Sequence, residues 1–263
     1  DAINLESNPD VSVLTQLSSS IEYLGMNTTK GPFQDVKVRQ AINYAIDPQV
    51  FVDTILEGRG QVANSVINST IPGWSEEVTG YDYDPEMAKQ LLAEAGYPDG
   101  FTTTFVCPTS GSGNMFPQIM NEYIQKCAEE VGIHIELDMS ESERVWDVMK
   151  VGFKDEYADV GALNTSFYTM FPNVFQKFAG TGGSFNTGKY SNPEYDACIE
   201  AAYAATDEAE STRQFIEAEN IFTEELPWVI VCNDRNLRVL APNVQNFAQS
   251  QTWYVDLTTV TVE

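Results

Sequence analysis

The strongest constraint on the fold is an alternation of strand and helix patterns between residues 101 and 163. Residues 101–107 alternate apolar and polar side chains, residues 119–131 carry apolar side chains at helical spacing up to Gly132, and residues 133–139 alternate again. A weaker copy follows, with a helical pattern around residues 145–149 and a strand pattern at residues 157–163. Strands that alternate with helices predict parallel pairing, so we expect an α/β lobe with a mixed sheet flanked by helices.

Helix ends elsewhere in the chain are marked by capping residues. Asp84 and Pro85 have the chemistry of an N-cap and a first helical residue, and Gly96 that of a C-terminal cap, so a helix is expected between them. Residues 61–83 show no period and predict a long surface excursion. The remaining helices are expected at residues 35–46 and 48–57, from Pro193 onward after a cap at Asn192, and at about 208–225. The remaining strands are expected within residues 11–27, 227–232 and 236–242.

The charge balance excludes several partners. The chain has 39 acidic and 14 basic residues, a formal net charge of −25. Such a surface repels phosphate backbones and anionic membranes, so nucleic acid is not an expected partner. The acidic residues are dispersed in pairs along the chain, which is typical of a solvated surface. They carry little information about the charge of a ligand.

Few residues of this chain fit catalysis or metal binding. His134 is the only histidine, which leaves no basis for a Ser-His or Cys-His nucleophile system or for a metal held by several histidines. The four cysteines form no CxxC pair, so we expect buried thiols, with a disulfide as the open alternative. No cofactor is expected. Paired carboxylates of a glycosidase stay possible, because 39 acidic residues make chance pairs inevitable.

Ligands of α/β sheets bind beyond the carboxyl ends of the strands, which selects two connections here. Residues 108–114 and 164–173 follow the strands predicted at 101–107 and 157–163. They offer neutral hydrogen-bonding groups and aromatic rings, which suit an uncharged or zwitterionic organic ligand and provide no general base. A plain connector at 108–114, and purely structural roles of Phe167 and Phe171 in the core, are the alternatives. The candidate ligand-binding residues are Ser110, Ser112, Asn114, Asn164, Thr165, Ser166, Phe167 and Tyr168.

Three long segments resemble one protein family. They are GPFQDVKVRQAINYAIDPQV (31–50), YDPEMAKQLLAEAGYPDGF (83–101) and KYSNPEYDACIEAAYAATDEAE (189–210). All three resemble the family 5 extracellular solute-binding proteins, the peptide and nickel receptors of ABC importers. The resemblance implies a periplasmic-binding-protein type II-like fold and the C-terminal lobe, domain III, of such a receptor. Residues 1–25 are then hinge-connecting strands from an N-terminal lobe, residues 26–232 the ligand-binding lobe, and residues 233–263 the strands that return.

The same resemblance implies function and partners. A small-molecule solute, an ABC permease in the membrane and the N-terminal lobe of the same parent chain are the implied partners, and the location is extracytoplasmic, in the periplasm or on a cell-surface lipoprotein. The chain begins inside an ordinary segment without a signal-peptide pattern, so we expect it to be cut from a longer protein. It is not expected to be an enzyme. A carbohydrate-active hydrolase lobe and a sensory or regulatory ligand-binding module are the alternatives.

Residues 165 and 168 depart from what the resemblance implies. In peptide-binding members a Trp, and three residues later an Asp that pairs with the peptide's amino terminus, follow the corresponding strand, and matching the segments puts Thr165 and Tyr168 at these places. A phenol carries no fixed negative charge. We therefore expect a solute whose primary ammonium group is absent or is recognised elsewhere, with Tyr168 stacking on it or donating a hydrogen bond. A lobe on its own is expected to bind weakly.

Overall fold

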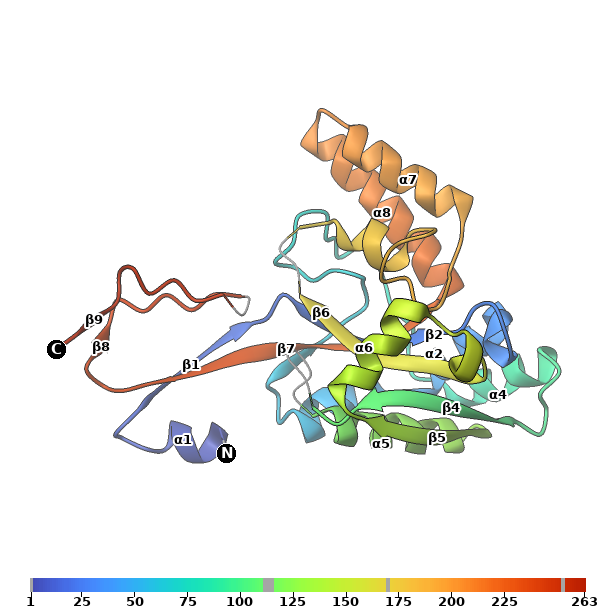
Figure 1. The fold of residues 1–263 in the computed structure, drawn as a ribbon, viewed down its shortest axis with the longest axis horizontal. Helices are drawn as coiled ribbons and strands as arrows, with labels where there is room; N and C mark the ends of the chain where they lie inside the picture. The colour runs from blue at the N-terminus through green and yellow to red at the C-terminus, as the bar shows by residue number, and fades with distance from the viewer. Residues whose placement is uncertain (1, 111–115, 169–170, 252–253) are drawn as a thin grey trace.

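The computed structural model describes residues 2–110, 116–168, 171–251 and 254–263. Its centre is a seven-stranded mixed sheet in which the path of hydrogen-bonded neighbours is β1-β7-β2-β6-β4-β5 (Figure 1). The seventh strand, β3, pairs with the edge of β7 opposite to β2. β4 pairs in parallel with both β5 and β6, while the other pairs are antiparallel. The strands of this sheet are β1 (Ser12–Leu17), β2 (Ser20–Met26), β3 (Gly60–Val62), β4 (Phe101–Pro108), β5 (Ile133–Ser140), β6 (Val160–Tyr168) and β7 (Trp228–Leu240).

Helices cover both faces of the sheet. On one face Leu24 and Met26 of β2 pack into a core with α2, α4 and α5, and on the other Ile21 and Tyr23 pack against α7 and α8. α6 covers β4 and β6 on this second face through a smaller cluster that includes Val148. The helices are α1 (Ala2–Glu6), α2 (Val36–Ala45), α3 (Pro48–Val50), α4 (Pro85–Glu94), α5 (Pro117–Glu129), α6 (Ser142–Val151), α7 (Pro193–Ala204) and α8 (Glu208–Glu225), with shorter turns η1 (Pro32–Gln34), η2 (Phe51–Ile55), η3 (Asp155–Tyr157) and η4 (Phe175–Ala179).

The predicted α/β lobe is confirmed, and so are most of its helix ends. Asp84 accepts a hydrogen bond from the Met87 backbone N–H at the start of α4, and Gly96 follows the end of this helix with φ 91°. Asn192 caps α7 in the same way. These ends are local in origin, because a side-chain oxygen of the preceding residue satisfies the free N–H groups of the first turn.

The expected strand at 157–163 is wrong in its bounds. β6 runs from Val160 to Tyr168, so residues 164–168, expected in a loop, form antiparallel pairs with β2. The two strands expected at 227–232 and 236–242 are one strand, β7. It stays continuous because it pairs with β2 and β3 up to Asp234 and with β1 from Arg235 onward. The helix expected at 48–57 is α3 followed by the π-helical turn η2.

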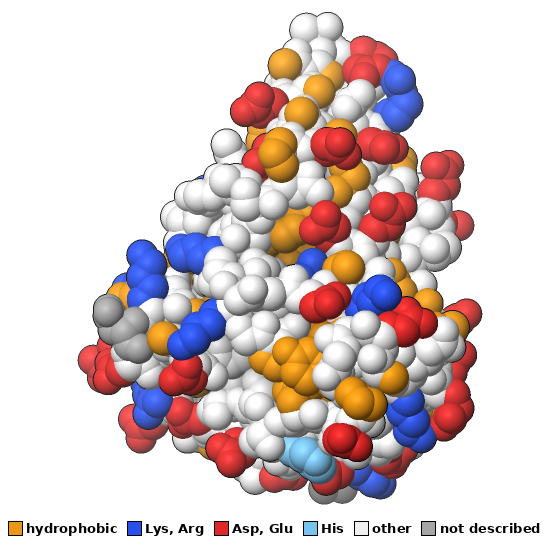
Figure 2. Space-filling model, turned by 90° about the vertical axis from the view of Figure 1, so that its right-hand side faces the viewer, with side chains coloured by type: hydrophobic (Ala, Val, Ile, Leu, Met, Phe, Trp, Pro, Cys, Tyr) orange, Lys and Arg blue, Asp and Glu red, His pale blue; other side chains and the backbone are white. Residues whose placement is uncertain are grey.

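Two structures extend away from the sheet. β1, the second half of β7 and the short strands β8 (Val244–Gln245) and β9 (Thr261–Val262) form an arm that projects from the lobe, and α7 and α8 form a protruding hairpin (Figure 1). Viewed from the end opposite the arm, the surface carries acidic side chains spread over all its parts (Figure 2), which fits their dispersal in the sequence. No helix in the described part of the chain is long and apolar enough to cross a membrane.

Candidate ligand-binding site

The carboxyl ends of the three parallel strands meet at one end of the sheet. Pro108 of β4 pairs with Ser140 of β5, and Tyr168 of β6 lies opposite Ser20, the first residue of β2. We call these four residues the sheet end. The arm leaves the lobe from this side, since β7 passes Ser20 before it reaches β1. The sheet end is the place where the sequence predicts a ligand.

The five candidates on β6 are divided between the two faces of the sheet. Side chains of a strand alternate, so Asn164 and Ser166 share the face of α5 while Thr165 and Phe167 share the face of α7 and α8. Ser166 is partly exposed and lies directly opposite Glu22 of β2. Thr165 is buried and lies against a narrow gap beside Phe185 and Trp228. The sequence predicted a loop that would bring all five residues to one rim of the lobe. Because they lie on a strand, their side chains are divided between the two faces of the sheet instead.

Asn164 is a buried connector of three elements. Its side chain is 0% exposed, its Nδ2 donates to the backbone oxygen of Tyr23 at 3.2 Å, and its Oδ1 accepts from Nδ2 of Asn121 in α5 at 3.1 Å. A buried amide needs such partners, because an unpaired polar group inside a protein is costly. Asn164 therefore fixes α5 and β2 to β6 from inside the lobe.

Phe167 also lies inside the lobe and not on its rim. It is 6% exposed, and its ring centroid lies 4.5 Å from that of Phe178, 5.6 Å from that of Tyr23 and 6.0 Å from that of Trp228. Aromatic pairs at such separations add to the stability of a core beyond their buried area. Phe167 sets the position of the end of β6.

The remaining candidates belong to the rim or lie outside the described residues. Ser110 is exposed just beyond β4, and its backbone oxygen accepts a hydrogen bond from the hydroxyl of Ser142 at 3.0 Å, which joins it to the start of α6. Tyr168 is placed by its backbone pair with Ser20. Ser112 and Asn114 lie outside the described residues.

Sequence reasoning missed a group of buried polar residues beside the sheet end. Ser18, Ser20, Glu22 and Asp234 are all almost fully buried, and the backbone N–H of Ser18 donates to the backbone oxygen of Asp234 at 3.0 Å. Asp234 is 4% exposed and its Oδ1 has no hydrogen-bond partner. Burial raises the pKa of its carboxyl group to about 6, against a smaller opposing effect of the Ser18 hydroxyl. The triple serine at 18–20 and the polar run at 233–236 inside an apolar strand were the available signals.

Residues that could suggest catalysis or metal binding have ordinary roles. His134 is half-exposed and lies 2.8 Å from a carboxylate oxygen of Glu129. All four cysteines are free thiols. Cys107 and Cys232 are buried as expected, whereas Cys127 and Cys198, also expected to be buried, are only partly buried because their helices lie at the surface. Across the described ranges, no group of three or more His, Cys, Asp and Glu side chains is placed to hold a metal ion.

The fold and the sheet end define a class, the α/β ligand-binding lobes. The sequence model of the bacterial extracellular solute-binding proteins, family 5 (Middle), matches residues 1–211. The chain belongs to this family. Its members bind solutes and are not enzymes.

Two relatives and two solved structures illustrate the similarity. The chain is 32% identical to heme-binding protein A of Haemophilus influenzae over 258 residues, 97% of this chain and 46% of the relative. It is 30% identical to the glutathione-binding protein GsiB of Salmonella paratyphi A over 253 residues, 92% of this chain and 48% of the relative. The structures of HbpA2 from Haemophilus parasuis (24% identity, TM-score 0.86) and of Staphylococcus aureus NikA with Ni(L-His)2 (20% identity, TM-score 0.83) share the fold over the whole chain.

These matches also show how much of the relatives the chain spans. It covers 52% of the HbpA2 structure and 55% of the NikA structure. The chain thus spans about half the length of the proteins that it resembles.

Proposed function

We propose that this chain is the C-terminal lobe of the substrate-binding component of an ABC importer, which captures a small extracellular solute and delivers it to a membrane permease. One observation carries the proposal: the carboxyl ends of three parallel strands lie beside the point where β1 and β7 leave the lobe. Two lobes that are joined by such strands can close on a solute by a hinge motion.

The proposed domain boundaries follow the same geometry. Residues 1–25 and 233–263 are the strands that connect to an N-terminal lobe of the parent chain, and residues 26–232 are the binding lobe. The arm supports this division, because Val239 of β7, Leu257 between β8 and β9, and Val262 of β9 are exposed apolar side chains. Exposed apolar patches commonly mark surfaces that another domain or partner covers. The proposed location is extracytoplasmic, in the periplasm or on a cell-surface lipoprotein.

The proposed solute contacts lie at the sheet end. Ser110, Ser166 and Tyr168 supply neutral groups there, and the proposed set includes Ser112 and Asn114. Thr165 is buried inside the lobe and is not proposed to contact the solute directly. Asn164 and Phe167 are buried and do not contact the solute directly. Their contacts inside the lobe fix the position of β6, which carries Ser166 and Tyr168. Relatives bear names that refer to heme and glutathione, and structural neighbours were solved with Met-Leu and with Ni(L-His)2. The proposed solute is a small organic molecule of this kind whose amino terminus is not read by residue 168.

A comparison of free and N-acetylated Met-Leu tests this proposal. Both dipeptides are titrated into the chain and into its Tyr168→Asp variant. We expect the chain to bind the two within about threefold of each other, and Tyr168→Asp to prefer the free amine by about tenfold, because a carboxylate pairs with an ammonium group. A preference of the unchanged chain for the free amine by about tenfold, lost in Tyr168→Ala, contradicts the proposal.

A further inference from the structure

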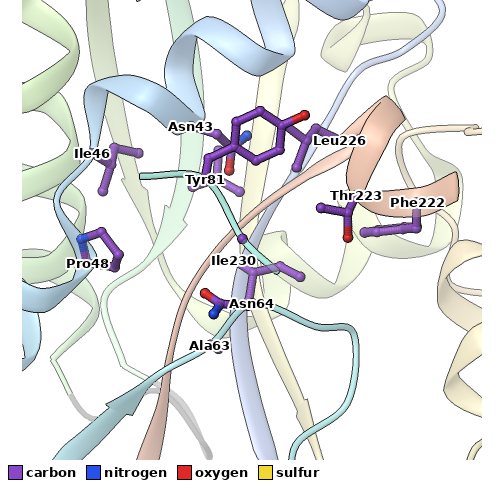
Figure 3. A pocket seen from close by; sticks show the side chains of 12 residues that line it. Asn43, Ile46, Pro48, Ala63, Asn64, Tyr81, Phe222, Thr223, Leu226 and Ile230 are labelled. Atoms are coloured by element: carbon purple, nitrogen blue, oxygen red, sulfur yellow. The ribbon is translucent and has the colours of Figure 1, made fainter. Parts of the chain in front are cut away.

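A groove runs along the edge of the sheet beside β3 and β7, outside the set of residues described above. It consists of three adjoining depressions that share Asn64 and that are lined largely by residues 61–83, with contributions from α2, α3, α8 and β7. The innermost, where side chains from α2, the 61–83 segment and α8 surround the edge of β7, is shown in Figure 3. The two outer ones have cavity volumes of about 270 and 650 Å³.

The groove and the sheet end are linked through β7 and β2, which lie between β3 and β6. Asn233 of β7 lines the smaller of the two outer depressions, and its Nδ2 donates to the backbone oxygen of Ser20 at 3.0 Å. Ser20 in turn pairs with Tyr168. A ligand that occupies both the sheet end and the groove must therefore be long enough to pass β2 and β7.

Buried anchors hold the wall of the groove in place. Asn68 donates from its Nδ2 to the backbone oxygen of Ser18 at 2.6 Å, and Ser65 hydrogen-bonds to the carboxyl group of Glu219. Val66, Ile67 and Ile71 lie in the core against α7 and α8. Residues 65–71 of this segment are thus held in place without a ligand, and a preformed wall saves part of the entropic cost of ordering a loop.

The charges in the groove have one sign. Among the described residues that line the three depressions there is no Lys, Arg or His. Glu76 and Asp82 are exposed there, and neither forms an ion pair with a residue of the described chain. Trp74, Tyr81 and Tyr83 add aromatic rings, which attract cations through their faces. A cationic group is the natural complement of this lining.

The edge of the sheet favours an extended peptide. Ala63 donates its backbone N–H to Val231 of β7, so the alternation of an antiparallel pair turns the backbone N–H and C=O of Val62 away from β7. Val62 lines both outer depressions. A peptide that adds to an exposed strand edge gains main-chain hydrogen bonds, and pockets beside the edge select its side chains.

We propose that this groove is a subsite for an extended solute peptide with Lys or Arg side chains, which lies along β3 and places its cationic groups near Glu76 and Asp82. The inference rests on the proposed function, since it extends the site at the sheet end. It also assigns a positive charge to a part of the solute that residue 168 does not contact.

The test is an amide NMR titration of the 263-residue chain with N-acetyl-Lys-Lys-Lys-amide, whose blocked ends leave only side-chain cations. We expect shifts at residues 61–64 and 74–83, and none with N-acetyl-Ala-Ala-Ala-amide. The double variant Glu76→Gln/Asp82→Asn should weaken binding by about fivefold to tenfold, as the loss of two ion pairs at a partly exposed site implies. The double variant Glu208→Gln/Glu217→Gln removes the same charge from α8 and should leave binding unchanged.

The outcomes separate the inference from the proposed function. If both double variants weaken binding of the lysine peptide equally, or if amide shifts spread over the whole acidic surface, the peptide is held only by long-range attraction. Either result would contradict the proposal that the groove is a peptide subsite. Equal binding of the two peptides would overturn it too. A third outcome is that amide shifts at the groove residues depend on Glu76 and Asp82 while no solute shifts residues 108–110 or 166–168. This result would support the peptide subsite and contradict the proposed role of the sheet end.

Discussion

Glu219 gives the chain a pH dependence of stability opposite to that of most carboxylates. This residue of α8 is 1% exposed. Its Oε2 accepts a hydrogen bond from the Ser65 hydroxyl, while its Oε1 has no hydrogen-bond partner. Burial raises the pKa of its carboxyl group from 4.5 to about 8. The folded chain therefore keeps this proton over a range in which the unfolded chain has released it, so this group contributes most below pH 4.5 and its contribution is lost as the pH rises toward 8.

The expected size follows from 1.36 kcal/mol for each unit of pKa difference. Between pH 4.5 and pH 7 the free energy of unfolding should fall by about 3 kcal/mol through Glu219 alone. Glu219→Gln cannot ionise, so the stability of this variant relative to the unchanged chain should rise by this amount over the same range. The difference between the two proteins isolates the group, because all other titrations are common to both.

Urea unfolding followed by circular dichroism at several pH values between 4.5 and 8 provides the measurement. The matched control is Glu217→Gln, which removes an exposed carboxylate from the same helix and should show no such trend. If the stability difference between Glu219→Gln and the unchanged chain stays constant over this range, the carboxyl group is already ionised at low pH or is hydrated, and the reasoning is refuted.

Other consequences of the buried contacts can be checked by the same unfolding assay and by thiol labelling. Asn164→Ala removes two buried hydrogen bonds and should cost about 2–4 kcal/mol, so a loss below 1 kcal/mol would contradict its role in joining α5 and β2 to β6. Gly100→Ala should cost at least about 2 kcal/mol, because φ is 77° and the new Cβ would lie 1.9 Å from the backbone oxygen of Gly132; an unchanged midpoint would disprove the close approach. Cys107 and Cys232 should resist labelling until the chain unfolds, since burial raises the pKa of both thiols, and rapid labelling in the native state, with the other two cysteines changed to serine, would show that they are accessible.

The helices could be predicted because their signals are local. Asp84 with Pro85, and Asn192 with Pro193, place a capping oxygen and a fixed φ at adjacent positions, and each pair starts a helix in the structure. The parallel pairing of β4 with β5 also follows from the spacing of the strands around one helix.

The end of β6 could not be predicted in the same way. Residues 164–168 are mostly polar and read as a loop, and they form a strand only because β2, more than 130 residues earlier in the chain, pairs with them. That pairing divides the candidate residues between two faces and buries Asn164 and Phe167. The groove is equally non-local, since it forms where the irregular 61–83 segment meets α2, α8 and β7.

The most direct test of the central claim is an amide NMR map of solute binding. Glutathione and Met-Leu are titrated in turn into the isotope-labelled chain, and the shifts of all assigned amides are compared. Binding at the sheet end predicts that the largest shifts fall on residues 108–110, 140–142 and 166–168, with little change in α4 or at the tip of the α7–α8 hairpin. Shifts confined to the opposite end of the sheet, around Met26 and Gly161, would contradict the claim.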